Sequence, residues 1–195
     1  MKYNLSEITA VIKDRRTIYP EFFSERKVHQ EIIENVLNNA IWAPTHGLTQ
    51  PWRFKVFTNG SRIRLSNKLV EIYNKHTLPE NYNEIKALKM QNRPLKSQVV
   101  IAVCMVKDTK GKIPEIEEVE AVACAVQNIH LTCTAYGLGG FWSTPGVIYK
   151  SEMNQFLKLA ENDKCLGLFY IGYPAGDWPS PGHRKPIEYV TEWIK

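Results

Sequence analysis

The stretch that decides the fold runs from Glu115 to Tyr136 and reads EIEEVEAVACAVQNIHLTCTAY. Its glutamates gather at the start, where the positive end of a helix dipole stabilises carboxylates. We interpret them as a solvated helix start rather than a metal site. The interior from Ala121 to Val126 is apolar nearly all round, which favours a place in the core or at a subunit interface. Gly137-Leu138-Gly139-Gly140 then ends the helix.

Segments on either side of this helix are typical of strands. Residues 98–106 are dense in β-branched side chains at consecutive positions, which indicates a central strand covered on both faces. Residues 165–172 are also apolar and indicate a second buried strand, and residues 53–58 alternate polar and apolar like a strand with one solvated face. Residues 76–97 are polar and poorly periodic, so we expect an excursion with some helix. Helical spacing of apolar residues is found over residues 5–12, 28–41 and 61–75.

The composition predicts one globular domain over residues 1–195. Hydrophobic residues make up 44% of the chain and charged residues 23%. A compact monomer of this mass would expose about 9,500 Å². The longest apolar run, Val99 to Val106, is far shorter than the roughly 20 residues that cross a bilayer, so no membrane partner is expected. The N-terminus lacks a secretory signal, and we expect a cytoplasmic protein.

The four cysteines indicate neither a disulfide framework nor a zinc site, because none forms a Cys-x-x-Cys pair. Cys124 and Cys133 are nine residues apart in the sequence and point to opposite faces of a helix. His130 and Cys133 share a face, the one spacing here that could form a thiolate–imidazole pair. A buried cysteine beside a helical histidine explains the same spacing without chemistry, and we favour it. No metal is predicted.

Marks of nucleotide hydrolysis and nucleic-acid binding are also missing. Gly111-Lys112 is followed by Ile113 rather than by Ser or Thr, so the chain has no nucleotide-hydrolase phosphate loop. The run Gly137 to Gly140 closes a helix, whereas a dinucleotide fingerprint follows a strand and opens a helix. The net charge is +5, but the basic residues mix with glutamates. We therefore expect no nucleic-acid partner.

Three loops and a basic tail stand out by composition. Arg15-Arg16-Thr17 places two guanidiniums and a hydroxyl in sequence, which suits a phosphate. A solvated arginine pair is the alternative. Residues 43–52, APTHGLTQPW, combine two prolines with polar side chains and an indole, for which an ordinary stiff turn is the alternative. The third loop comprises residues 141–148, and the tail carries His183-Arg184-Lys185-Pro186.

Taken in order, these motifs resemble the FMN-dependent nitroreductase family, in particular its small bacterial YdjA-like type. The resemblance covers residues 15–186 and includes Gln50-Pro51-Trp52 and Gly137-Leu138-Gly139 with Trp142. It implies an α+β, nitroreductase-like fold with a mainly antiparallel sheet flanked by helices. It also implies an intertwined homodimer in which both subunits contribute to each flavin site.

The resemblance assigns roles to particular side chains. Arg15 and Arg16 would hold the FMN phosphate and the pyrimidine end of the ring, and Arg184 would be a second phosphate cation. Thr17 keeps the hydroxyl that the family usually takes from serine, and Gln50 would hydrogen-bond ribityl or ring oxygens. The residues expected to reach the flavin of the partner subunit are Pro44, Thr45 and His46. Those expected to lie along the isoalloxazine are Trp142, Ser143 and Thr144. Trp42 would form an apolar wall of the substrate site.

The activity implied by the resemblance is that of an FMN-dependent NAD(P)H oxidoreductase. Hydride would pass from NAD(P)H through FMN to a nitroaromatic, quinone or enone acceptor by ping-pong chemistry in one shared site. Because the cofactor carries the hydride chemistry, no catalytic side chain is assigned. Two alternatives stay open. One is a flavin-storage or flavin-sensing protein of the same fold without efficient nicotinamide turnover. The other is a dedicated reductase or dehalogenase of a single substrate.

Overall fold

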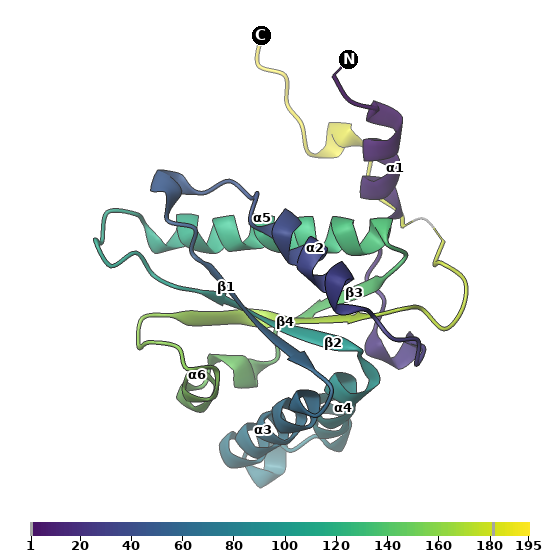
Figure 1. The fold of residues 1–195 in the computed structure, drawn as a ribbon. Helices are drawn as coiled ribbons and strands as arrows, with labels where there is room; N and C mark the ends of the chain where they lie inside the picture. Colours follow the sequence, from purple (N-terminus) through teal and green to yellow (C-terminus); the bar gives the residue numbers. More distant parts are fainter. Residues whose placement is uncertain (1, 181) are drawn as a thin grey trace.

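The computed structural model describes residues 2–180 and 182–195, which form six α-helices and four β-strands (Figure 1). The helices are α1 (Leu5–Asp14), α2 (Gln30–Ala40), α3 (Ser61–His76), α4 (Glu84–Lys96), α5 (Glu115–Ala135) and α6 (Ser151–Leu157). The strands are β1 (Trp52–Thr58), β2 (Val99–Met105), β3 (Gly139–Ser143) and β4 (Lys164–Gly172). The helices and strands expected from residues 5–12, 28–41, 53–58, 61–75, 98–106 and 165–172 are therefore confirmed within a few residues.

The four strands form one sheet in the order β1-β2-β4-β3, and each neighbouring pair is antiparallel. β2 lies inside the sheet, and all of its residues are buried, as its unbroken apolar run predicts. β3 lies at one edge, where Thr17 adds a parallel bridge to Gly140. The expected α+β fold with a mainly antiparallel sheet is confirmed.

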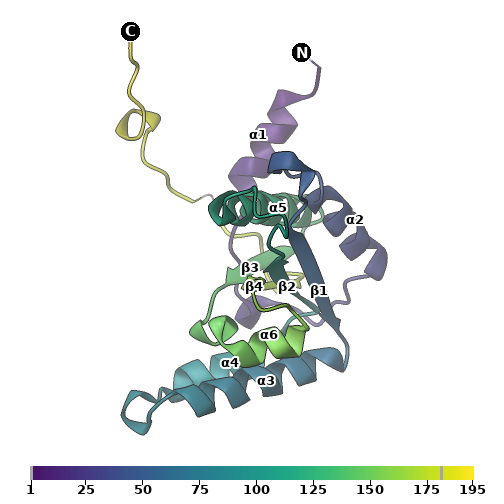
Figure 2. The same ribbon diagram turned by 90° about the vertical axis from the view of Figure 1, so that its left-hand side faces the viewer.

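Helices cover both faces of the sheet. Figures 1 and 2 show α2 and α5 on one face and α3, α4 and α6 on the other. Successive side chains of β2 point to opposite faces, so this strand serves two cores. Ile101 and Val103 pack into the core that contains the buried face of α5. Val100 and Ala102 pack into the core that contains the buried residues of α3 and α6.

One long face of α5 is buried and the other is exposed on the single chain. Cys133 is buried and Cys124 is exposed, which confirms that the two thiols point to opposite faces. Glu118 departs from the expected solvated start of this helix, because its side chain is buried. Its carboxylate oxygens accept the backbone N–H of Asp108 at 3.0 and 3.1 Å. This carboxylate thus anchors the loop that leads into the helix.

Two segments differ from the expectations. Residues 141–143 belong to edge strand β3 instead of a loop, because the turn after α5 already closes at Gly137, which has a φ of 69°, and the strand starts at Gly139. A Cβ at Gly140 would lie 2.7 Å from Cζ of Phe169, so only glycine lets the strands pack this closely. The second segment, residues 76–97, contains the regular helix α4. Its periodicity is weak because it exposes apolar side chains on its outer face, including Ile85 and Leu88.

α1 and the C-terminal tail extend beyond α5, away from the sheet (Figures 1 and 2). None of the residues of α1 is buried, although its sequence is amphipathic. Trp193 and Ile194 in the tail are 82% and 93% exposed. The chain exposes 12559 Å² in total, well above the value of about 9,500 Å² for a compact monomer of this mass. These projections leave a large apolar surface uncovered on the single chain.

Candidate cofactor-binding site

Three guanidiniums converge where the end of α1 meets the C-terminal tail. Arg15 is the C-cap residue of α1, and Arg16 follows it. Gly182 of the tail lies against both Arg16 and Arg184, because a Cβ added there would be 3.8 Å from Cζ of Arg16 and 3.3 Å from Nη1 of Arg184. Burial and the neighbouring charges of Arg184 and Arg16 lower the pKa of Arg15 below its ordinary value. None of the three forms an ion pair with a carboxylate of the described residues. An anion would relieve this repulsion.

Arg16 makes mainly backbone contacts. Its Nε donates to the carbonyl oxygen of Ser180 at 3.0 Å. Its Nη1 donates to the carbonyl oxygens of Lys13 and Arg15. These bonds tie the C-terminal tail to the end of α1 and fix the turn that carries Arg15. The geometry therefore gives Arg16 a positioning role beside the direct contact that the sequence predicted.

A cavity of about 400 Å³ opens beside this turn, and we call it the arginine cavity. Arg15 and Thr17 line it from one side and Trp142 of β3 from another. At its base, Nε2 of His130 lies 2.9 Å from the carbonyl oxygen of Arg16. Burial lowers the pKa of His130 to about 4, so the neutral imidazole donates this hydrogen bond. His130 is thus a satisfied core histidine, as we favoured over a thiolate–imidazole pair.

A second cavity of about 560 Å³ lies on the other side of β3, and we call it the lysine cavity. Ser143 lines the lysine cavity, whereas its neighbour Trp142 lines the arginine cavity. Arg93 also lines the lysine cavity. Its guanidinium lies 5.5 Å from the ring centroid of Tyr19 and 4.9 Å from that of Phe141, and both rings line the arginine cavity. The two cavities therefore meet along the edge of the sheet.

The loop over residues 44–50 lies at the opposite end of α5 from the arginines (Figure 1). Its His46 Nδ1 is 2.5 Å from Oε2 of Glu117, and its Thr45 Oγ1 accepts the backbone N–H of Gln50 at 3.2 Å. The arginine cavity reaches Ala123 of α5, about 9 Å from Glu117 along the helix. His130, which contacts the arginine turn, is about 20 Å from Glu117 along the same helix. Leu48 and Gln50 both have positive φ, at 55° and 46°, a strain that marks functional loops more often than plain turns.

A single chain therefore brings together only part of the predicted site. Arg15, Thr17 and Trp142 share the arginine cavity, and Ser143 lies in the lysine cavity. Thr144 lines neither of these cavities. Trp42, which lies just after α2, is 84% exposed and also lines neither cavity. The predicted residues that lie away from both cavities in the loop are Pro44, Thr45, His46 and Gln50.

The residues that join the two cavities and line the second were not predicted from the sequence. Tyr19 has no motif around it, and its place follows from the bridge between Thr17 and Gly140. Lys86, Lys89 and Arg93 are spaced i, i+3 and i+7, which places them on one face of a helix. This i, i+3, i+7 spacing of basic residues is the signal in the sequence that indicates the stripe.

Residues 2–180 and 182–195 contain no group of three or more His, Cys, Asp or Glu side chains placed to hold a metal ion. In the same part of the chain, no helix is both long and apolar enough to cross a membrane.

Comparison with known proteins decides the family. The model of the nitroreductase family matches residues 12–173. The chain belongs to the nitroreductase family. The resemblance read from the loop motifs is thereby confirmed, and so is the expectation of an oxidoreductase.

Three curated relatives of the chain are informative. YfhC of Bacillus subtilis, described as a candidate NAD(P)H nitroreductase, is 26% identical over 93% of this chain and 91% of its own length. YdjA of Escherichia coli, described in the same way, is 26% identical over 74% of this chain and 76% of its own length. An iodotyrosine deiodinase of Hydra vulgaris is 26% identical over 90% of this chain and 68% of its own length.

Solved structures show the same fold. A nitroreductase-like family protein from Bacillus cereus superposes with a TM-score of 0.82 at 26% identity, and covers 100% of this chain and 98% of its own. The FMN-dependent nitroreductase NfnB from Mycobacterium smegmatis, solved in complex with NADPH, has a TM-score of 0.75 at 18% identity. That likeness covers 98% of this chain and 100% of NfnB.

Proposed function

We propose that this nitroreductase-family chain is an FMN-dependent NAD(P)H oxidoreductase that reduces a nitroaromatic, quinone or enone acceptor. The observation that carries the proposal is the convergence of Arg15, Arg16 and Arg184 without a carboxylate partner among the described residues. Such a cluster is costly unless an anion neutralises it, and a phosphate suits it best. Relatives described as candidate NAD(P)H nitroreductases support the same reading.

The donor set fits FMN along the edge of the sheet. Arg15 and Thr17 would hold the phosphate end, with Arg184 as the second cation, and Arg16 would fix the turn. Trp142 would supply a flat apolar wall, and Ser143 and Thr144 would lie at the far end of β3. When bound, FMN supplies reversible hydride exchange, which no side chain of the chain offers. The protein's part is to bind, to orient and to exclude water.

A second copy of the chain would complete the site. Pro44, Thr45, His46 and Gln50 line neither cavity of their own chain, so they would serve the cofactor bound to the partner subunit. The exposed area above the compact-monomer value and the uncovered apolar face of α1 support a homodimer. Residues 1–195 would then act as one FMN-binding domain, in which Trp42 forms part of the acceptor wall.

Anaerobic reduction tests the proposal directly. The purified protein should be yellow, and NADH or NADPH should bleach its flavin absorbance in the absence of oxygen. A subsequent nitroaromatic or quinone should restore the colour. A colourless protein that cannot be reconstituted with FMN would overturn the proposal.

The dedicated-enzyme alternative has an observation of its own, the similarity to an iodotyrosine deiodinase. Turnover with one acceptor class and negligible turnover with the rest would favour it. Full FMN occupancy with slow bleaching by both nicotinamides would instead favour the storage or sensing alternative.

A further inference from the structure

The lysine cavity is strongly cationic. Lys86, Lys89 and Arg93 line it from one face of α4. Lys150, just before α6, lines it from the other side, and His76 lines it from the end of α3. The basic side chains thus come from α4, from the end of α3 and from the residue before α6, and they meet at one cavity.

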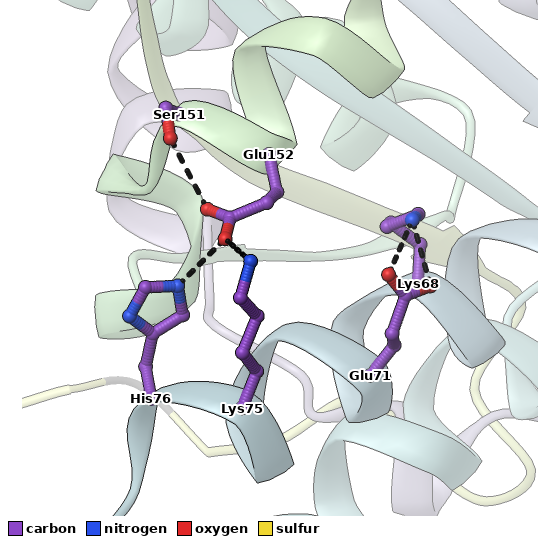
Figure 3. Close-up of polar contacts among 6 residues, drawn as sticks. All are labelled: Lys68, Glu71, Lys75, His76, Ser151 and Glu152. Atoms are coloured by element: carbon purple, nitrogen blue, oxygen red, sulfur yellow. Dashed lines mark hydrogen bonds and ion pairs between the residues drawn. The ribbon is translucent and has the colours of Figure 1, made fainter.

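The nearby carboxylates are already engaged. Oε1 of Glu152 lies 2.7 Å from Nζ of Lys75 and 2.9 Å from Nε2 of His76 (Figure 3). These two contacts hold the pKa of Glu152 well below its usual range, so the carboxylate stays charged. Its other oxygen, Oε2, accepts from the hydroxyl of Ser151 at 3.3 Å. Glu152 is therefore a fixed part of the rim and is not free to neutralise another lysine.

Glu21 is engaged in the same way. Its Oε1 lies 2.9 Å from Nε of Arg93, which neutralises that arginine from the side of Tyr19. No ion pair of the described residues includes Lys86, Lys89 or Lys150. Three lysines without an ion-pair partner among the described residues therefore remain at the cavity, where Lys86 and Lys89 are exposed and Lys150 is half-buried.

Helix stability does not explain these lysines. Like charges three residues apart, such as Lys86 and Lys89, repel one another across a helix turn. On α3 the chain uses the opposite arrangement, because Lys68 pairs with Glu71 one turn later (Figure 3). The stripe on α4 lacks that compensation, which points to a ligand outside the helix.

The cavity also has an apolar wall. Tyr73, Met90, Val147 and Tyr170 line it, and the side chain of Tyr170 is fully buried. A volume of about 560 Å³ lies within the usual range for sites that bind small molecules. Such a cavity suits a ligand that has a flat apolar body and one anionic group.

We propose that the lysine cavity binds an amphipathic anion, whose carboxylate or phosphate is held by Lys86, Lys89 and Lys150 while its apolar body lies against the apolar wall. This inference rests on the proposed function for the identity of the ligand, because the ligand is then one of the two molecules that the enzyme oxidises or reduces. Its anionic group has two possible sources. It is either a carboxylate on the acceptor or a phosphate on the nicotinamide nucleotide.

Equilibrium binding to the FMN-loaded, oxidised protein tests the site without turnover. Isothermal titration compares 4-nitrobenzoate with 4-nitrobenzamide, which has the same shape but no charge. A second pair, adenosine 2′,5′-bisphosphate and adenosine 5′-monophosphate, differs by one phosphate. We expect the more anionic member of one pair to bind more tightly, with a preference that shrinks as salt is raised.

The variants are Lys86→Gln/Lys89→Gln and, separately, Lys150→Gln. Each substitution should lower the affinity for the favoured anionic probe by about three- to tenfold and leave the affinity for its less charged partner unchanged. Lys96→Gln is the matched control, because Lys96 is an exposed lysine of the same helix that does not line the cavity. None of these lysines belongs to either buried core, so circular dichroism should report an unchanged fold.

The outcomes separate the sources and the two proposals. If the cavity variants lose affinity only for 4-nitrobenzoate, the subsite belongs to the acceptor. If they lose affinity only for the bisphosphate, the subsite belongs to the nucleotide. Equal affinity for the charged and less charged members of both pairs, or equal effects of Lys96→Gln and the cavity variants, would overturn the subsite. A preserved charge preference without any reduction by NAD(P)H would count against the proposed function alone.

Discussion

The Nε2 atom of His130 donates a hydrogen bond of 2.9 Å to the backbone carbonyl oxygen of Arg16. His130 lies on the buried face of α5, and Arg16 lies in the turn after α1, 114 positions earlier in the sequence. The next residue of that turn, Thr17, bridges to Gly140 at the edge of the sheet. One neutral imidazole therefore holds the arginine turn against both the central helix and the sheet.

The first prediction concerns pH. Burial lowers the pKa of His130 from its ordinary value of 6.5 to about 4 in the folded chain. Between these two values the unfolded state binds a proton that the folded state does not. Stability should therefore fall as the pH drops from about 6.5 towards 4, by about 3 kcal/mol from this group.

Urea unfolding at a series of pH values measures this effect. The substitution His130→Gln keeps an N–H donor but removes the titration, so its free energy of unfolding should vary less across the same range. Parallel pH profiles for the two proteins would show that His130 does not carry the acid sensitivity.

The second prediction concerns cofactor retention. Arg15 lines the arginine cavity and has no carboxylate partner among the described residues, so Arg15→Gln should weaken FMN binding by about tenfold or more. Arg16→Ala should also weaken it, because the turn loses its bonds to Lys13 and Ser180. Lys110→Gln, at an exposed loop position, is the control. Fluorescence titration of the apoprotein with FMN measures the affinity of each variant. Equal FMN affinity of the arginine variants and the Lys110→Gln control would show that the arginines do not belong to the site.

The third prediction concerns Gly167, which lies under the indole of Trp142. A Cβ there would be 2.1 Å from Nε1 of Trp142, and the φ of 150° is also unfavourable for other residues. Gly167→Ala should destabilise the protein by about 2–4 kcal/mol and displace the indole from the arginine cavity. Gly176→Ala is the control, because an added Cβ would meet nothing within 4 Å.

A double variant separates the clash from the backbone strain. Adding Trp142→Ala to Gly167→Ala should recover part of the lost free energy of unfolding, because the colliding ring is gone. Strictly additive losses in chemical denaturation would mean that the two residues do not interact as the structure indicates.

The fourth prediction concerns the homodimer. Ile8 is 47% exposed on the apolar face of α1, and Ile63 is 55% exposed on α3, on the far side of the sheet. Ile8→Asp should shift sedimentation from dimer towards monomer, whereas Ile63→Asp should not. The exposed thiol of Cys124 lies on α5, the helix expected in the core or at a subunit interface. It should be protected from a thiol reagent in the dimer and react in the Ile8→Asp monomer. If the unsubstituted protein sediments as a monomer and its Cys124 reacts rapidly with the thiol reagent, the dimer is contradicted.

Local patterns in the sequence were sufficient for much of the fold. The apolar runs of β2 and β4 and the long apolar helix α5 could be read directly, because hydrophobic periodicity reflects which faces are buried. The motif order from Arg15 to Arg184 was sufficient to indicate the family, and the family model agrees.

Tertiary structure alone decided how the site is divided. Strand β3 exists because β4 pairs with it, and such non-local pairing leaves little trace in a glycine-rich segment. The placement of Trp142 and Ser143 in different cavities follows from that strand. The separation of the 44–50 loop from the arginines follows from the length of α5, which holds them apart. The order of motifs along the sequence indicated which residues belong to the site. Only the folded chain showed which of them one subunit can bring together, because distances across a sheet and along a helix depend on packing between remote segments.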